Sequence, residues 1–269
     1  MNEQRVVLRQ QRDLGQIFEG TINLCIQNFG PLFAIAAVVI PIGIASAAFQ
    51  EGIDDLWVEA AVLSGLGLLQ GIASLLAAAA VIAALAEIDA GRPAEFSRAY
   101  DAAFAKIWTL AGAVLRVAAV IFPALALLLT FSILASYADP DSNDAALLFI
   151  LPLVMIVTLP WIVYFAVRWL FVEQAVILDG TSAKAALSYS ADAMTGSWWR
   201  TFGIAALTGI VAGVPATIVS ALFALAPPLV SGTVNALVNA ALLPFTITAM
   251  TLLYMDLKTR KETAVAEGP

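Results

Sequence analysis

The sequence predicts an all-α integral membrane protein with six transmembrane helices. Hydrophobic residues make up 61% of the 269-residue chain and charged residues only 12%, against about 45–50% and 25% in soluble domains. One soluble core cannot bury so much apolar surface, and large exposed apolar patches cause aggregation. Crossing the hydrocarbon layer of a membrane takes about 20 mostly apolar residues. Six stretches qualify, at 31–49, 58–85, 107–137, 145–167, 201–226 and 230–254.

The connections between these spans alternate in charge. All 13 lysine and arginine residues lie in the N-terminal segment, the second and fourth connections, the C-terminal segment or the adjoining span ends. Cytoplasmic loops collect lysine and arginine, so the pattern predicts that both termini are cytoplasmic. The other three connections carry only acidic charge, from Glu51, Asp54, Asp55, Glu59, Asp139, Asp141 and Asp144.

Three segments that precede the odd-numbered spans have the pattern of helices lying on the membrane surface. Residues 12–29 and 93–107 place apolar side chains on one arc and polar ones opposite, which is typical of interfacial amphipathic helices. Residues 182–196 begin with Ser182, a plausible N-cap, and end at Gly196, a plausible helix stop. We predict three interfacial helices on the cytoplasmic face.

The distribution of proline and aspartate predicts three units, each an amphipathic helix followed by a two-span hairpin. Each odd-numbered span carries one proline of the set Pro41, Pro123 and Pro215. Each even-numbered span ends near an aspartate, namely Asp89, Asp179 or Asp256. Internal repeats are common in membrane transporters, but they also build ordinary helical bundles. We expect one membrane domain over residues 1–269, with a short cytoplasmic tail at 257–269.

Basic and tryptophan side chains at the cytoplasmic span ends are the candidates for contact with lipid head groups. Residues 117–137 already suffice for a span, so Arg116 is expected to extend its head group to the interface. Arg168 is expected to pair loosely with Glu173, or Glu173 with Arg116. The full candidate set is Arg12, Arg92, Arg98, Trp108, Arg116, Arg168, Trp198, Trp199 and Arg200.

Polar side chains inside the spans are few. Gln70 lies in the second span, and Asn235 and Asn239 lie four residues apart on one face of the sixth. We expect these amides to form hydrogen bonds between helices, worth about 0.6–2 kcal/mol each; the alternative is a solute pathway. Two glycine pairs, at 67 and 71 and at 209 and 213, have the spacing of close helix contacts. We expect them to pack within the bundle; the alternative is a contact between two copies of the chain.

Three stretches carry a family resemblance. They are RDLGQIFEGTINLCIQNFGPLF at residues 12–33, AALSYSADAMTGSWWRTFGI at 185–204 and LLYMDLKTRKE at 252–262. Together they resemble the membrane-domain family of bacterial glycerophosphoryl diester phosphodiesterases. The resemblance implies an integral module of the bacterial cytoplasmic (inner) membrane. The phosphodiesterase activity of that family belongs to a separate soluble domain that uses histidines and a metal, and this chain has no histidine.

The residues favour a non-catalytic function. The spans contain no paired carboxylates, and the chain has no histidine base and no nucleotide or metal motif, so we expect neither enzymatic activity nor a cofactor. The leading hypothesis is a scaffold or accessory module that engages membrane lipids or a partner membrane protein at the cytoplasmic face. The alternative is a channel or facilitative transporter for a small polar or amphiphilic solute. A polar cavity reaching the amides favours this alternative, and a dry, tightly packed bundle favours the scaffold.

The expected partners follow from the same features. Membrane lipids come first, and a membrane protein partner or a homo-oligomer is left open. No basic domain or base-stacking groove is present in the sequence, so nucleic acid is not an expected partner.

Overall fold

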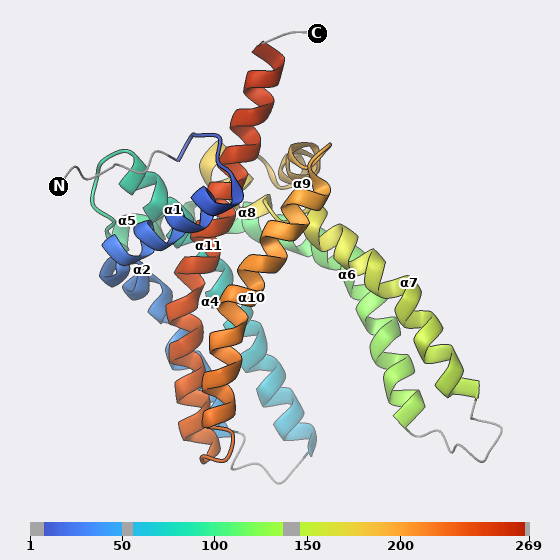
Figure 1. Cartoon of the computed structure of the whole chain (residues 1–269). Coiled ribbons are helices and arrows are strands. Elements are labelled where there is room, and N and C mark those ends of the chain that lie inside the picture. Colours follow the sequence, from blue (N-terminus) through green and yellow to red (C-terminus); the bar gives the residue numbers. More distant parts are fainter. Residues whose placement is uncertain (1–7, 50–55, 137–145, 267–269) are drawn as a thin grey trace.

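The computed structural model describes residues 8–49, 56–136 and 146–266, and these form helices and short connections without strands (Figure 1). The acidic residues expected in the first and third connections lie outside these residues, as does the side chain of Glu59. Six helical segments are long and apolar enough to cross a membrane: Phe29–Phe49, Ala61–Asp89, Ile107–Ser136, Ile150–Asp179, Trp198–Leu222 and Pro228–Ala266. The chain is therefore a polytopic helical membrane protein, as the sequence predicts.

The first span is broken near its middle. It consists of a helix, a short 3₁₀ segment and a second helix, α2 (Phe29–Ala36), η1 (Ala37–Val39) and α3 (Ile40–Phe49). Pro41 has no N–H group to donate to the carbonyl four residues earlier, and its ring crowds that position. The chain therefore tightens into a 3₁₀ turn just before the proline and continues as a helix beyond it.

The first span packs with three further helices into a bundle (Figure 1). The buried run of small and branched side chains from Ala77 to Leu85 forms the centre of this bundle. Alanine at so many positions lets the neighbouring helices approach closely. The three helices are α4 (Leu56–Asp89), α10 (Trp198–Leu222) and α11 (Pro228–Ala266).

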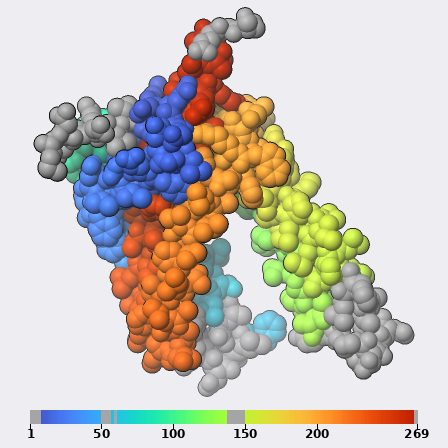
Figure 2. Space-filling model, in the orientation of Figure 1, coloured from blue at the N-terminus to red at the C-terminus, as the bar shows by residue number. Residues whose placement is uncertain are grey.

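The remaining two spans form a hairpin that diverges from the bundle, made of α6 (Ile107–Ser136) and α7 (Ala146–Arg168). The two helices pack chiefly against each other, and Figure 2 shows an open wedge between them and the bundle. None of the most apolar part of α6 is buried, whereas 61% of the corresponding part of α4 is buried. The hairpin therefore offers apolar side chains on both faces, as a helix pair surrounded by lipid does.

Four short helices form a layer across one end of the bundle, which we call the cap layer. The N-terminal described residues and the C-terminal end of α11 lie at this same end (Figure 1). Within the layer, α1 packs on α11, α5 packs on the end of α4, and α9 packs on α8. Each packs on an even-numbered span or its continuation. The layer consists of α1 (Leu14–Gln27), α5 (Phe96–Ala105), α8 (Val172–Asp179) and α9 (Ala183–Ala193).

The ends of the cap-layer helices follow local sequence signals. Asp13 caps α1 by accepting from the Gln16 backbone N–H at 2.8 Å, while the Gln16 side chain accepts from the Asp13 N–H. The predicted N-cap at Ser182 is confirmed, because its hydroxyl accepts from the Ala185 N–H at 3.4 Å. Gly196 has a φ of 81° in the turn before α10, where a residue without Cβ is favoured. The expected tail begins as a continuation of α11, which extends as helix to Ala266.

The predicted glycine contacts within the bundle are wrong. A Cβ atom placed on either member of the 67 and 71 pair, or of the 209 and 213 pair, would meet nothing within 4 Å. Glycine spacing does not reveal which face of a helix meets a neighbour, and these glycines lie on open faces. The close approach occurs instead between α3 and α11, where Gly43 faces Ala236.

Candidate functional site

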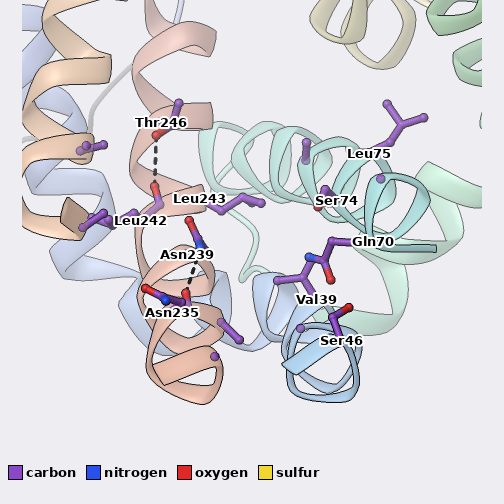
Figure 3. Close-up of a pocket in the computed structure, with 18 of the residues that line it drawn as sticks. Val39, Ser46, Gln70, Ser74, Leu75, Asn235, Asn239, Leu242, Leu243 and Thr246 are labelled. Carbon is purple, nitrogen blue, oxygen red and sulfur yellow. Dashed lines mark hydrogen bonds between the residues drawn. The ribbon is translucent and has the colours of Figure 1, made fainter. Parts of the chain in front are cut away.

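A cavity of about 960 Å³ lies among α3, α4, α10 and α11, on the side of the bundle that faces the hairpin (Figure 3). It is bordered toward the hairpin by Val114 of α6 and at the cap-layer end by Glu173 of α8. The three amides singled out in the spans, Gln70, Asn235 and Asn239, all line it. The sequence placed Gln70 in the second span and the two asparagines in the sixth, and the fold brings all three to one site.

Small residues create the space. Gly71 and Ala78 of α4 and Gly213 and Ala216 of α10 present almost no side chain to the cavity. Most of the remaining wall is aliphatic. The result is a mainly apolar groove with a few polar groups, which is the usual composition of a small-molecule site.

The amides differ in their partners. The side-chain oxygen of Asn235 accepts from the Ser220 hydroxyl of α10 at 2.5 Å, which is the interhelical bond expected for such a residue. The Asn239 amide nitrogen donates at 2.9 Å to the backbone carbonyl of Asn235 in its own helix. Gln70 Oε1 is buried and has no hydrogen-bond partner among the described residues. Gln70 and Asn239 lie on opposite sides of the space between α4 and α11 in Figure 3.

Hydroxyl groups complete the polar lining, and the sequence analysis missed them. Ser46, Ser74 and Ser231 lie on three different helices around the cavity. Single serines in apolar helices carry little signal by themselves. The spacing of Ser231, Asn235 and Asn239 on α11, each four residues from the next, is the pattern that indicates one polar face.

Glu173 is the acidic group of the cavity. The expected pairing of this carboxylate with Arg168 or Arg116 does not occur: Arg168 Nη1 donates to the Tyr164 hydroxyl at 2.8 Å, and Arg116 Nη1 donates to the Gly112 carbonyl at 2.6 Å. The two arginines lie at exposed positions of the hairpin. Glu173 lies instead on α8 in the cap layer, facing the cavity.

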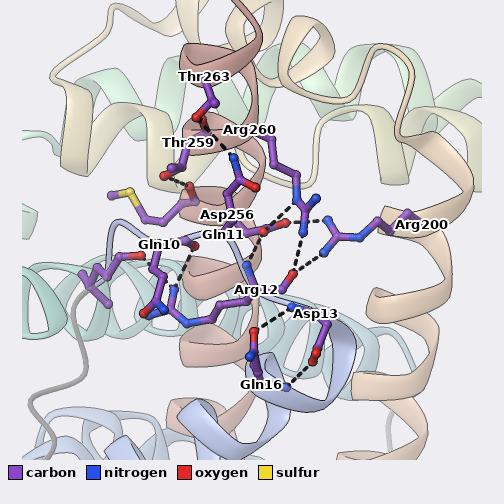
Figure 4. A network of polar contacts seen from close by, with 12 residues as sticks. Gln10, Gln11, Arg12, Asp13, Gln16, Arg200, Asp256, Thr259, Arg260 and Thr263 are labelled. Carbon is purple, nitrogen blue, oxygen red and sulfur yellow. Dashed lines mark hydrogen bonds and ion pairs between the residues drawn. The ribbon is translucent and has the colours of Figure 1, made fainter. Parts of the chain in front are cut away.

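A second polar cluster ties the cap layer together around Asp256 (Figure 4). Asp256 is fully buried in α11 and accepts from the Arg12 backbone N–H at 2.7 Å. It also forms ion pairs with Arg200 at 2.5 Å and Arg260 at 2.9 Å. Both arginines donate in addition to the Arg12 carbonyl, each at 2.8 Å. One buried carboxylate thus joins the segment before α1 to α10 and α11.

The other two span-end aspartates have similar positions. Asp89 accepts from the Leu8 backbone N–H at 2.8 Å. Asp179 accepts from the Tyr254 hydroxyl and from the Lys258 ammonium, both on α11. Each aspartate therefore fixes the end of one span to a segment distant in the sequence.

Arg12 is placed differently from the expected lipid contact. It is only 5% exposed, and its guanidinium donates to the Leu8 carbonyl at 2.9 Å. Burial lowers the pKa of this guanidinium, while the negative charge of Asp256 acts in the opposite direction. Arg12 is a structural group of the cap layer. Arg200 is also committed to the cluster, which sequence spacing alone did not indicate.

The remaining interface candidates stay near the surface. Arg92 pairs with Glu87 at 2.5 Å, and Arg98 pairs with Glu95 at 2.6 Å. Hydrogen bonding from Arg98 lowers the pKa of the Glu95 carboxyl. Exposed pairs of this kind add about 0–1 kcal/mol, so they leave these arginines able to meet other anions.

The tryptophans divide into exposed and packed ones. Trp108 and Trp199 are 87% and 78% exposed. Trp198 stacks on Phe202 with ring centroids 5.3 Å apart and lies 6.3 Å from the Tyr164 ring of α7. Trp198 therefore connects α10 to the hairpin, while the other two are free to contact lipid.

Comparison with known proteins relates the second part of the chain to a described family. Residues 144–264 match the family described as the membrane domain of glycerophosphoryl diester phosphodiesterase. The resemblance carried by the sequence motifs is confirmed for this segment, which runs from α7 to α11 and contributes α8, α10 and α11 to the cavity. No curated protein and no solved structure matches the chain.

Proposed function

We propose that this chain, whose residues 144–264 match the membrane domain of glycerophosphoryl diester phosphodiesterase, is a non-catalytic membrane module that binds a membrane lipid in its lateral cavity. The observation that carries the proposal is the cavity of about 960 Å³, lined by Gln70, Asn235 and Asn239 and facing the wedge between bundle and hairpin. Ligand sites in proteins span about 300–1,000 Å³, so the space suits one amphiphile.

The shape favours a lipid over a water-soluble solute. A conducting pathway needs a wall on every side, whereas this cavity borders the wedge seen in Figure 2. In a membrane the wedge is filled by acyl chains. A ligand with one polar part and one apolar part can place its polar part against the amides while its chain stays in the wedge. The channel or transporter alternative named a small polar or an amphiphilic solute. Of these two kinds of ligand, the geometry favours the amphiphilic one.

The charge pattern sets the orientation within this proposal. The basic connections meet in the cap layer, so we place that layer and both termini on the cytoplasmic side of a bacterial inner membrane. There Trp108 and Trp199 contact head groups. The cap layer then acts as the scaffold surface, and three of its helices, α1, α5 and α9, each begin one helix-plus-hairpin unit.

A pair of glycine variants tests lipid binding. Gly71 lines the cavity, and Gly67 lies one turn away on the same helix outside it; a Cβ at either position meets nothing within 4 Å. Gly71→Phe therefore adds a phenyl group to the cavity lining from a Cβ position that meets no atom, and Gly67→Phe adds the same side chain outside the cavity. After purification from native membrane, we expect mass spectrometry to find several-fold less retained lipid with Gly71→Phe and an unchanged amount with Gly67→Phe. Equal retention by both variants would contradict the proposal.

A further inference from the structure

The described lining of the cavity carries an acidic side chain and no basic one. Among its described lining residues Glu173 is the single ionisable side chain, and no lysine or arginine lines it. Within the described part of the chain Glu173 forms no ion pair. A carboxylate that is partly removed from water without a partner is costly, and it is stabilised by any cation that enters.

Several polar groups around the cavity donate within their own helix and keep oxygen lone pairs free. The hydroxyls of Ser46, Ser231 and Thr246 already donate to carbonyls of their own helices, at 3.0, 3.2 and 3.3 Å. The Asn239 amide nitrogen is used in the same way. The hydroxyl oxygens and the amides of Gln70 and Asn235 remain for a ligand, the amides as N–H donors as well as acceptors.

The unpaired carboxylate favours a positively charged head group that can donate hydrogen bonds to it. A primary ammonium carries three donors and no acceptor, so it satisfies both the carboxylate and the free oxygens. A head group that carries only negative charge meets Glu173 without a compensating cation. The exposed basic side chains near the hairpin, Arg168 and Lys184, lie in a separate groove between α7 and α9.

We infer that the lipid held in the cavity carries a primary ammonium head group and that Glu173 selects it. The inference rests on the proposed lipid binding and names the class of lipid. The wedge between hairpin and bundle gives the acyl chains a path, which a free amine in water does not need. Glu173 lies at the cap-layer end of the cavity, so the head group enters from the leaflet on that side.

The test uses the full chain in nanodiscs made of equal amounts of phosphatidylethanolamine and phosphatidylglycerol with identical acyl chains. The variant is Glu173→Gln, which removes the charge and keeps the side-chain size. The matched control is Glu262→Gln, because Glu262 is an exposed acid on the cap-layer end of α11 outside the cavity. After detergent extraction, the retained lipids are counted by mass spectrometry, and thermal unfolding confirms that each variant is folded.

We expect the wild-type chain and Glu262→Gln to retain the ethanolamine lipid with about tenfold enrichment over the bulk ratio, the effect of one charge-assisted contact. Glu173→Gln is expected to retain as much lipid in total but near the bulk ratio. A wild-type ratio equal to the bulk, or enrichment that persists in Glu173→Gln, overturns the inference while lipid binding stands. If the wild-type chain retains no lipid, both the proposed lipid binding and the inferred head-group preference are overturned.

Discussion

Gly43 of α3 lies so close to Ala236 of α11 that a Cβ atom on the glycine would be 2.8 Å from the alanine Cβ. Gly232 of α11 is pressed in the same way against Ala47 of α3. Each helix thus contributes a glycine and an alanine four residues apart, which is how small residues let membrane helices approach. All four residues line the cavity. This contact between α3 and α11, which we call the seam, therefore forms one wall of the cavity.

The seam predicts a selective loss of stability. Gly43→Val forces methyl groups against Ala236 and should lower the free energy of unfolding by about 1–3 kcal/mol, as overpacking does. Gly209→Val adds the same side chain where a Cβ meets nothing within 4 Å and should leave stability nearly unchanged. Thermal unfolding in one detergent measures both. Equal midpoints for the two variants would show that α3 and α11 do not approach this closely.

Removal of the Asp256 carboxylate should cause a larger loss of stability, centred in the cap layer. Its carboxylate is fully buried between Arg200, Arg260 and the Arg12 backbone. Asp256→Ala leaves these donors without their acceptor, and breaking a buried pair in this way costs about 3–5 kcal/mol. We also expect faster proteolysis near α1, whose N-terminal segment the cluster holds. Glu262→Ala, on the same helix and exposed, is the control; a similar loss there would assign the effect to α11 in general.

The two adjacent tryptophans should behave differently. Trp198→Ala removes the stacking on Phe202 and the contact with Tyr164 and should cost about 2 kcal/mol. Trp199→Ala, at a 78% exposed position, should change stability by less than about 0.5 kcal/mol. In a Cys25→Ser background, a cysteine at the buried position Ala186 reports on α9. Its labelling should rise with Trp198→Ala alone, and a rise with Trp199→Ala instead would reverse the assignment.

The orientation of the chain has its own test. Reporter fusions at residue 140, in the third connection, and at residue 190, in α9, should report opposite sides of the membrane. Alkaline phosphatase should be active at 140 and a cytoplasmic fluorescent protein should be bright at 190. The same compartment for both positions is incompatible with one span, α7 and its continuation α8, crossing the membrane between them.

The sequence predicts the number and place of the spans well because each span must satisfy a length and a hydrophobicity that lipid imposes. It predicts the local caps at Ser182 and Gly196 for a similar reason, since these depend on neighbouring residues alone. The helix contacts are different. Gly67 and Gly209 have the right spacing on the wrong faces, whereas Gly43 and Gly232 do pack, because the outcome depends on how helices distant in the chain are rotated.

The sequence also revealed some of the residues that line the cavity, but not all of them. Gln70, Asn235 and Asn239 are conspicuous because amides are rare in apolar spans, and all three line the cavity. Glu173 gave no such signal. It lies five residues beyond Arg168 at the end of the span, and that spacing suggested a loose pair at the interface. Only the turn between α7 and α8 directs it into the cap layer and away from Arg168, and no local pattern encodes that turn.

Crosslinking with a photoactivatable lipid tests lipid occupancy of the cavity most directly. The wild-type chain, in membranes containing a lipid with a diazirine in its acyl chain near the glycerol, is irradiated and digested, and the modified peptides are identified. We predict modification within 70–78 of α4 and 235–247 of α11, and its loss in Gly71→Phe but not in Gly67→Phe. Modification confined to outward residues of the hairpin, such as Leu115 and Ile156, and unaffected by Gly71→Phe, would contradict the account.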